Sequence, residues 1–189
     1  MFIISQIDRN GFYTGVALES DVCPIGFVLA APPQPQSGMI PRWIGGQWGM
    51  LPAANKAGFD LAALKGAAIV AVQTKFAQII AAGFSTGGVH VAIDGESRAN
   101  LSGMAATALA VSAKIPGITW PASYQSWWSI EGTPIPIPAP ADGLAFAAAA
   151  GIYYSQAVVH EATLVGEIEA AADAATLGAI DIDAGWPAP

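Results

Sequence analysis

Gly83-Phe84-Ser85-Thr86-Gly87 matches the G-x-S-x-G pattern that presents a serine nucleophile in many hydrolases. In those enzymes the serine lies on a sharp turn between a strand and a following helix, where a histidine and an acid activate it. Here helical spacing precedes the motif and strand-like spacing follows it, so the required context is reversed. Asp94 and His160 would have to complete the triad. We therefore favour the interpretation that the two glycines end a helix and begin a hairpin.

The other chemistry-bearing side chains are sparse. His90 and His160 lack the further ligands that a zinc or iron site needs, and the adjacent Glu161 would point elsewhere on a helix. Asp181 and Asp183 would share one side of a strand, but calcium takes about six to eight oxygen ligands. The sequence thus predicts no catalytic residue, no metal site and no cofactor-binding site.

Tryptophan is the one conspicuous residue type, with six copies, all in segments that read as strand or loop. Exposed tryptophans bind sugars or protein partners, because the ring combines a large contact area with one polar group. Packing across small sheets is the other interpretation, and the sequence leaves both open. The candidate partner-contact residues are Trp43, Trp48, Trp127, Trp128 and Trp186.

Charge is scarce and unevenly distributed. Charged residues make up 11% of the 189 residues, against about 25% in an average soluble protein. This predicts a surface covered by copies of the chain or by other proteins, although an alanine-rich composition alone would also lower the charge. From Ile115 onward there are eight acidic residues and no lysine or arginine, so nucleic-acid binding is disfavoured.

The sequence also bears on compartment. A membrane span needs about 18 or more apolar residues, and the best stretch, Leu61 to Ala82, is interrupted by lysines and glutamines. We therefore expect no membrane insertion. The first nine residues lack the basic start and apolar run of a secretory signal, so we expect synthesis in a cytoplasm. Cys23 is the only cysteine, which excludes an internal disulfide, and we expect it to be a small buried hydrophobe.

Residues 1–52 read as a small β module. An apolar run at 2–4, an Asn10-Gly11 turn and a returning strand from Tyr13 predict a hairpin. A proline-rich connector over 32–38 leads to a second hairpin, with Gly45-Gly46 at its turn and a tryptophan on each arm.

Residues 53–189 read as a helix-rich domain with a minor antiparallel sheet. Apolar residues at three- and four-residue steps predict helices over about 60–82, capped by Asp60, and about 142–172, capped by Asp142. A shorter helix is predicted between them, at about 98–113. Strands are predicted at about 89–93 and within 118–131, and the acidic tail after Ile180 is a candidate last strand. The predicted fold class is α+β.

Two stretches resemble bacteriophage tail proteins. Pro32-Pro33-Gln34-Pro35 followed by Arg42-Trp43-Ile44-Gly45-Gly46-Gln47-Trp48 resembles the proline-linked tryptophan hairpin near the start of tail-fibre and tail-fibre-assembly proteins. Residues of about 75–187 resemble a domain of unknown function common in phage tails. The segments that carry this second resemblance are 93–103, 127–132, 179–182 and 185–187. The usual acidic-Asn turn after the tryptophan strand is Glu131-Gly132 here, so that loop is expected to differ in shape.

The resemblance implies tail association and supplies no catalytic residue. We therefore expect a non-enzymatic virion component from the tail-fibre or tail-tip region, forming a homo-oligomer and contacting other tail proteins and the host surface. Its expected locations are the virion tail and, during assembly, the host cytoplasm. One alternative is an assembly chaperone that leaves before the particle matures. A more distant alternative is a serine hydrolase acting on host glycan.

Overall fold

The computed structural model describes residues 1–34 and 36–188, and over these residues the fold is α+β, as the sequence predicts, with 47% helix and 22% strand. Pro35 of the proline connector and the terminal Pro189 lie outside the described residues. The chain forms two compact units, Met1–Gly66 and Ala67–Pro189. The boundary falls inside a helix and lies 14 residues after the predicted boundary at residue 52.

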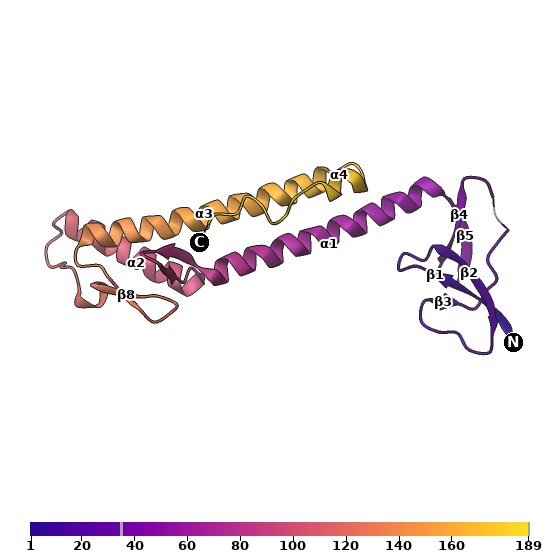
Figure 1. The fold of residues 1–189 in the computed structure, drawn as a ribbon, viewed down its shortest axis with the longest axis horizontal. Helices are drawn as coiled ribbons and strands as arrows, with labels where there is room; N and C mark the ends of the chain where they lie inside the picture. Colours follow the sequence, from indigo (N-terminus) through magenta and orange to yellow (C-terminus); the bar gives the residue numbers. More distant parts are fainter. Residues whose placement is uncertain (35, 189) are drawn as a thin grey trace. The chain divides into compact units, whose positions relative to one another are not determined.

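Five short strands precede the first long helix, and the later strands come in pairs between helices (Figure 1). The strands are β1 (Phe2–Ile7), β2 (Tyr13–Ser20), β3 (Phe27–Val28), β4 (Met39–Ile44), β5 (Gln47–Pro52), β6 (Phe84–Thr86), β7 (Val89–Val91), β8 (Ser126–Trp128) and β9 (Pro134–Pro136). The helices are α1 (Ala53–Ala82), α2 (Gly95–Ser112), the 3-10 turn η1 (Ala122–Tyr124), α3 (Pro140–Ala170) and α4 (Ala174–Gly178).

The N-terminal unit contains the two predicted hairpins. Strands β2, β1 and β3 form an antiparallel sheet, and β4 pairs with β5. Gly45 and Gly46 both have positive φ, at 59° and 87°, which is the backbone that a two-residue type I′ turn requires. The turn sets Trp43 opposite Trp48, and their rings meet edge to face with centroids 5.2 Å apart.

The same unit includes the first turns of α1, which are held by cations on aromatic rings. The guanidinium of Arg42 lies 4.3 Å from the ring centroid of Phe59 and 5.2 Å from that of Phe12. The Lys56 ammonium lies 3.3 Å from the Asp8 carboxylate and 2.6 Å from that of Asp60. Burial raises the pKa of Asp8, but hydrogen bonds from the backbone N–H groups of Phe12 and Asn10, together with Lys56, lower it overall.

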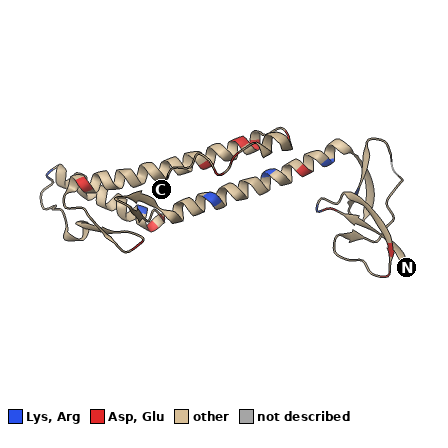
Figure 2. Ribbon diagram, in the orientation of Figure 1, with Lys and Arg blue, Asp and Glu red and all other residues tan. Residues whose placement is uncertain are grey.

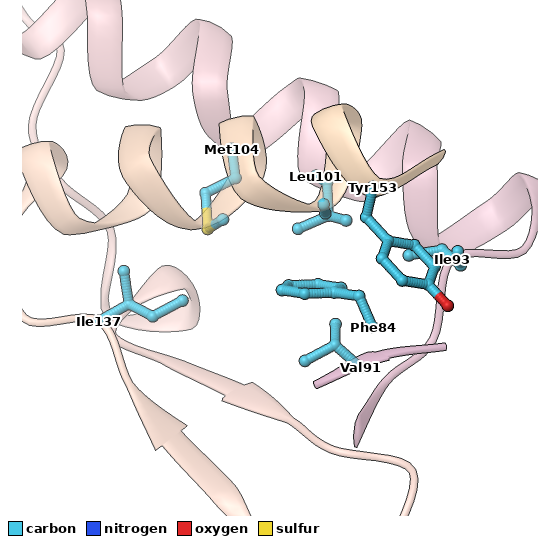
Figure 3. Packing of buried hydrophobic residues seen from close by; sticks show 8 residues of the cluster. Phe84, Val91, Ile93, Leu101, Met104, Ile137 and Tyr153 are labelled. Atoms are coloured by element: carbon cyan, nitrogen blue, oxygen red, sulfur yellow. The ribbon is translucent and has the colours of Figure 1, made fainter. Parts of the chain in front are cut away.

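The C-terminal unit has one apolar core. It is built where the β6–β7 and β8–β9 hairpins meet α2 and α3, and Ile79 and Ile80 of α1 pack against it. Figure 3 shows the buried side chains gathered in one cluster. Its buried members are Phe84, Val91, Ile93, Leu101, Met104, Ile137, Ala150 and Tyr153. Each large apolar side chain contributes roughly 1.5–3 kcal/mol on full burial.

Several predicted boundaries were wrong for local reasons. Helix α1 begins at Ala53, directly after Pro52, so Asp60 lies inside the helix and pairs with Lys56 rather than capping it. Helix α3 begins at Pro140, where proline costs no hydrogen bond, and Asp142 accepts from the backbone N–H of Ala139 at 3.1 Å. The two-stranded sheets are short, and the predicted strand at Ile118–Trp120 is irregular chain that follows a turn at Pro116-Gly117.

The tail and the cysteine also differ from prediction. Residues 180–188 form irregular chain with a turn at 182–183 rather than a strand, and Asp181 accepts hydrogen bonds from the backbone N–H groups of Asp183 and Ala184. Cys23 is exposed rather than buried, in the turn region after β2, where its thiol donates to the Phe27 carbonyl at 3.4 Å.

Candidate functional site

The serine motif lies at the end of α1 and in the β6–β7 hairpin. Gly83 has φ +76°, and its N–H donates to the carbonyls of Ile79 and Ile80 at 3.3 Å, so it ends the helix as predicted. Gly87 and Gly88, with φ of 59° and 82°, form the hairpin turn. The resulting register sets Ser85 directly opposite His90, with both side chains on one face of the hairpin.

His90 is bound to the turn after β8. Its Nδ1 lies 2.6 Å from Oε1 of Glu131, and its backbone N–H donates to Oε2 at 3.0 Å. The backbone N–H of Ile130 donates in turn to the His90 carbonyl at 2.8 Å. The ring of His90 and then its backbone N–H lower the pKa of Glu131 to about 2. One carboxylate therefore joins the two hairpins of the C-terminal unit.

This arrangement supplies part of a nucleophilic site. A carboxylate on Nδ1 fixes the histidine ring and leaves Nε2 for a second partner, as in a serine triad. No hydrogen bond joins Ser85 to His90 in the part of the chain that the structure describes. Such bonds are often loose in the absence of substrate. The contacts that are present make the His90–Glu131 pair a link between hairpins.

Two of the three residues of the sequence-based triad have other partners. Asp94 caps α2 by accepting from the backbone N–H of Ser97 at 2.8 Å, and this bond lowers its pKa. His160 lies on α3, where its Nε2 is 2.9 Å from the carbonyl oxygen of Ala184. The structure therefore engages Asp94 and His160 away from Ser85. Glu131 was missed because it lies 41 residues from His90, which leaves no local spacing to detect.

The five candidate tryptophans fall into two groups. Trp43 and Trp48 pack on each other, Trp127 packs on Phe146 in the core, and Trp186 packs on His160 and Phe76. Trp128 alternates with Trp127 on β8 and points outward, with 65% of its surface exposed. Among the five, Trp128 is therefore the side chain most available to a partner.

A groove of about 360 Å³ lies between α2 and α3. Small side chains line much of it, and at one side the Arg98 guanidinium stacks 3.7 Å above the Tyr154 ring. Within residues 1–34 and 36–188, no cluster of three or more His, Cys, Asp or Glu side chains is placed to hold a metal ion. Helix α1 is long and apolar enough, by length and composition, to cross a membrane.

Comparison with known families assigns the C-terminal part of the chain. Residues 63–184 match the domain of unknown function DUF4376. The chain belongs to this family. The DUF4376 region includes the α1–β6 junction, the His90–Glu131 link and helices α2 to α4, whereas strands β1 to β5 precede it. No curated protein and no solved structure matches the chain.

Proposed function

We propose that the chain is a structural component of a bacteriophage tail, from the tail-fibre or tail-tip region, that acts through protein–protein assembly as a homo-oligomer. The residues that resemble tail proteins support this assignment, and the larger resembling stretch overlaps the DUF4376 region. The low content of charged residues also supports assembly, because a surface with few charges suits contact with other proteins better than contact with water.

The exposure of α1 is the observation that carries the proposal. This helix has 30 residues, and Val72 is its one buried residue. Helices of this length in soluble proteins gain most of their stability by burying an apolar face. Phe59, Leu64 and Val70 are instead exposed. A helix surface of this kind fits a protein that is completed by neighbouring polypeptides.

Mass spectrometry of purified particles of the encoding phage tests the assignment. Peptides from both units should be recovered from intact particles, in amounts comparable to known tail subunits. An assembly chaperone that departs would be present in the infected-cell lysate and missing from particles. That result would replace the structural role with the chaperone alternative.

One observation keeps a hydrolase as a second candidate. Ser85 lies opposite His90, whose ring is held by Glu131. The candidate is tested by incubating the protein with host-surface glycan and comparing Ser85→Ala with the unmodified chain. We expect no cleavage by either protein. Cleavage that disappears in Ser85→Ala would overturn the non-enzymatic assignment.

A further inference from the structure

The groove between α2 and α3 is lined mainly by apolar side chains. Its volume of about 360 Å³ is in the range of small-molecule sites in proteins, which is about 300–1,000 Å³. Leu101 and Ala150 line it and are buried, with 3% and 2% of their surfaces exposed. Short side chains leave the space between the two helices unfilled, and these belong to Ala105, Ala147, Ala148 and Gly151.

Arg98 is the one charged residue among those that line the groove. Its guanidinium is held on the Tyr154 ring at 3.7 Å, and its Nε donates to the Asp94 carbonyl oxygen at 3.3 Å. Within residues 1–34 and 36–188, no salt bridge joins Arg98 to a carboxylate. A guanidinium has five N–H donors, arranged in a planar fork that fits a carboxylate. One end of the groove therefore presents a positioned cation with further donors for an anion.

We propose that this groove binds a fatty acid, with the carboxylate on Arg98 and the aliphatic chain running along α3 toward Leu144. The proposal goes beyond the proposed function and does not depend on it. A mainly apolar lining with one polar group that fixes the orientation of the ligand is the usual composition of a small-molecule site.

Charge selects a ligand with a single negative charge. The C-terminal unit, residues 67–189, has ten acidic residues and three lysines or arginines, so only a local contact can favour an anion there. No acidic residue lines the groove, and Figure 2 shows no lysine, arginine or acidic residue on α3 between Asp142 and Glu161. Exposed charges more than about 8 Å away are largely screened in physiological salt. One guanidinium matches one carboxylate, whereas a doubly charged phosphate would leave a charge uncompensated.

The shape of the groove selects an unbranched chain. Leu144 lies ten residues before Tyr154, which corresponds to about 15 Å along α3. Packed helices lie about 8–10 Å apart, so the space between them is narrow as well as long. Tyr154 is the one aromatic residue in the lining, and Arg98 covers a face of its ring. The groove therefore offers little for an aromatic ligand to stack on, whereas a methylene chain can follow it.

Titration calorimetry on the full chain tests both parts of the ligand. Octanoate is compared with octanol, which has the chain without the charge, and with acetate, which has the charge without the chain. We expect octanoate to bind at least fivefold more tightly than octanol, because hydrogen bonds to a charged group are stronger than neutral ones. Affinity should rise from hexanoate to decanoate by up to about fourfold per buried methylene. Absent octanoate binding, or equal affinities for octanoate, octanol and acetate, would overturn the proposal.

Arg98→Gln tests the head-group contact. We expect it to lower the affinity for octanoate to that for octanol, and to leave the affinity for octanol unchanged. Lys114→Gln is the matched control, because it removes a positive charge just beyond the end of α2 and outside the groove. An equal loss of octanol binding in Arg98→Gln would mean that Arg98 only shapes the groove, which would overturn its role as the carboxylate partner.

Gly151→Leu tests the location, because it fills the groove without changing its charge. Apart from the adjacent residues and the backbone of α3, no heavy atom lies within 4 Å of a Cβ added at Gly151 or at Gly166. Leucine favours a helix more than glycine does, so both substitutions should leave α3 folded, which circular dichroism checks.

We expect Gly151→Leu to lower the affinity for octanoate at least tenfold. Gly166→Leu, outside the groove on the same helix, should leave that affinity unchanged. An unchanged affinity in Gly151→Leu, or an equal loss in both variants, would show that octanoate binds another apolar surface of the chain. Either result would overturn the proposal.

Discussion

Glu131 shows how a single residue sets the pH range of a contact. Its pKa is lowered from 4.5 to about 2 by His90, so the bond contributes fully to stability above pH 4.5 and is lost as pH falls through about 2. We expect Glu131→Gln to lower the melting temperature at pH 6. The difference from the unmodified chain should narrow between pH 4.5 and 2. Glu167→Gln, an exposed carboxyl on α3, is the control in fluorimetric melts. A difference that stays constant down to pH 2 would contradict this role.

Gly83 is restricted both by its backbone conformation and by the space around it. Its φ is +76°, and a Cβ added there would lie 2.3 Å from the Val91 carbonyl oxygen. Gly87 also has positive φ, at 59°, but nothing lies within 4 Å of its added Cβ. We expect Gly87→Ala to cost about 1–2 kcal/mol of unfolding free energy from backbone strain alone, and Gly83→Ala to cost clearly more. Urea denaturation measures both. Equal losses would show that the contact with Val91 relaxes without cost.

For single residues, the sequence predicted backbone conformation better than it predicted contacts between residues distant in the chain. The glycines at 45–46 and at 83 were assigned correctly, because positive φ is a local property that few other residues tolerate. The His90–Glu131 link was not predictable, because its two residues lie 41 positions apart, with α2 and β8 between them in the chain. Cys23 was misplaced for a similar reason, since its exposure depends on the turn around it.

The C-terminal tail is an element fixed by a few aromatic and polar contacts. The Trp186 ring lies edge-on to His160, with centroids 4.8 Å apart, and also contacts Phe76 of α1. Asp183 pairs with Lys75 at 2.7 Å. We expect Trp186→Ala to release residues 180–188, because the contacts that remain are exposed: the ion pair, worth only about 0–1 kcal/mol, and the hydrogen bond between His160 and the Ala184 carbonyl. Hydrogen exchange should then become fast in the tail while remaining slow in α2. Unchanged protection of the tail would show that the Trp186 ring is not what holds it.

At the element scale, periodicity located the long helices and turn residues located the hairpins. Ends were less predictable, because Pro52 and Pro140 could begin helices as well as end the preceding segments. The tail alternates apolar and acidic residues like a strand, yet no strand edge accepts it. Asp181 bonds its own backbone instead, which is the ordinary behaviour of aspartate in turns. Alternation predicts a strand only where a partner strand exists.

The molecule as a whole is divided within a helix rather than at a linker. The boundary between the two units follows Gly66, and beyond the adjacent residues and backbone of its own helix no heavy atom lies within 4 Å of a Cβ added there. The sequence analysis placed the boundary at residue 52 because the second hairpin closes at Leu51-Pro52. The first turns of α1 belong to the N-terminal unit instead, because Lys56 pairs with Asp8 and the Phe59 ring contacts Arg42.

A proline at this boundary tests whether each unit is stable by its own contacts. We expect Gly66→Pro to break α1 locally, at a cost of about 3 kcal/mol confined to the neighbouring turn. The core around Phe84 and the Arg42 contacts should persist, because neither includes Gly66. Val72→Pro is the contrasting variant, since Val72 is buried within the C-terminal unit. Calorimetry should show a clearly smaller loss of melting temperature for Gly66→Pro than for Val72→Pro. Equal destabilisation by both substitutions would mean that both units need a continuous α1 and unfold in a single transition.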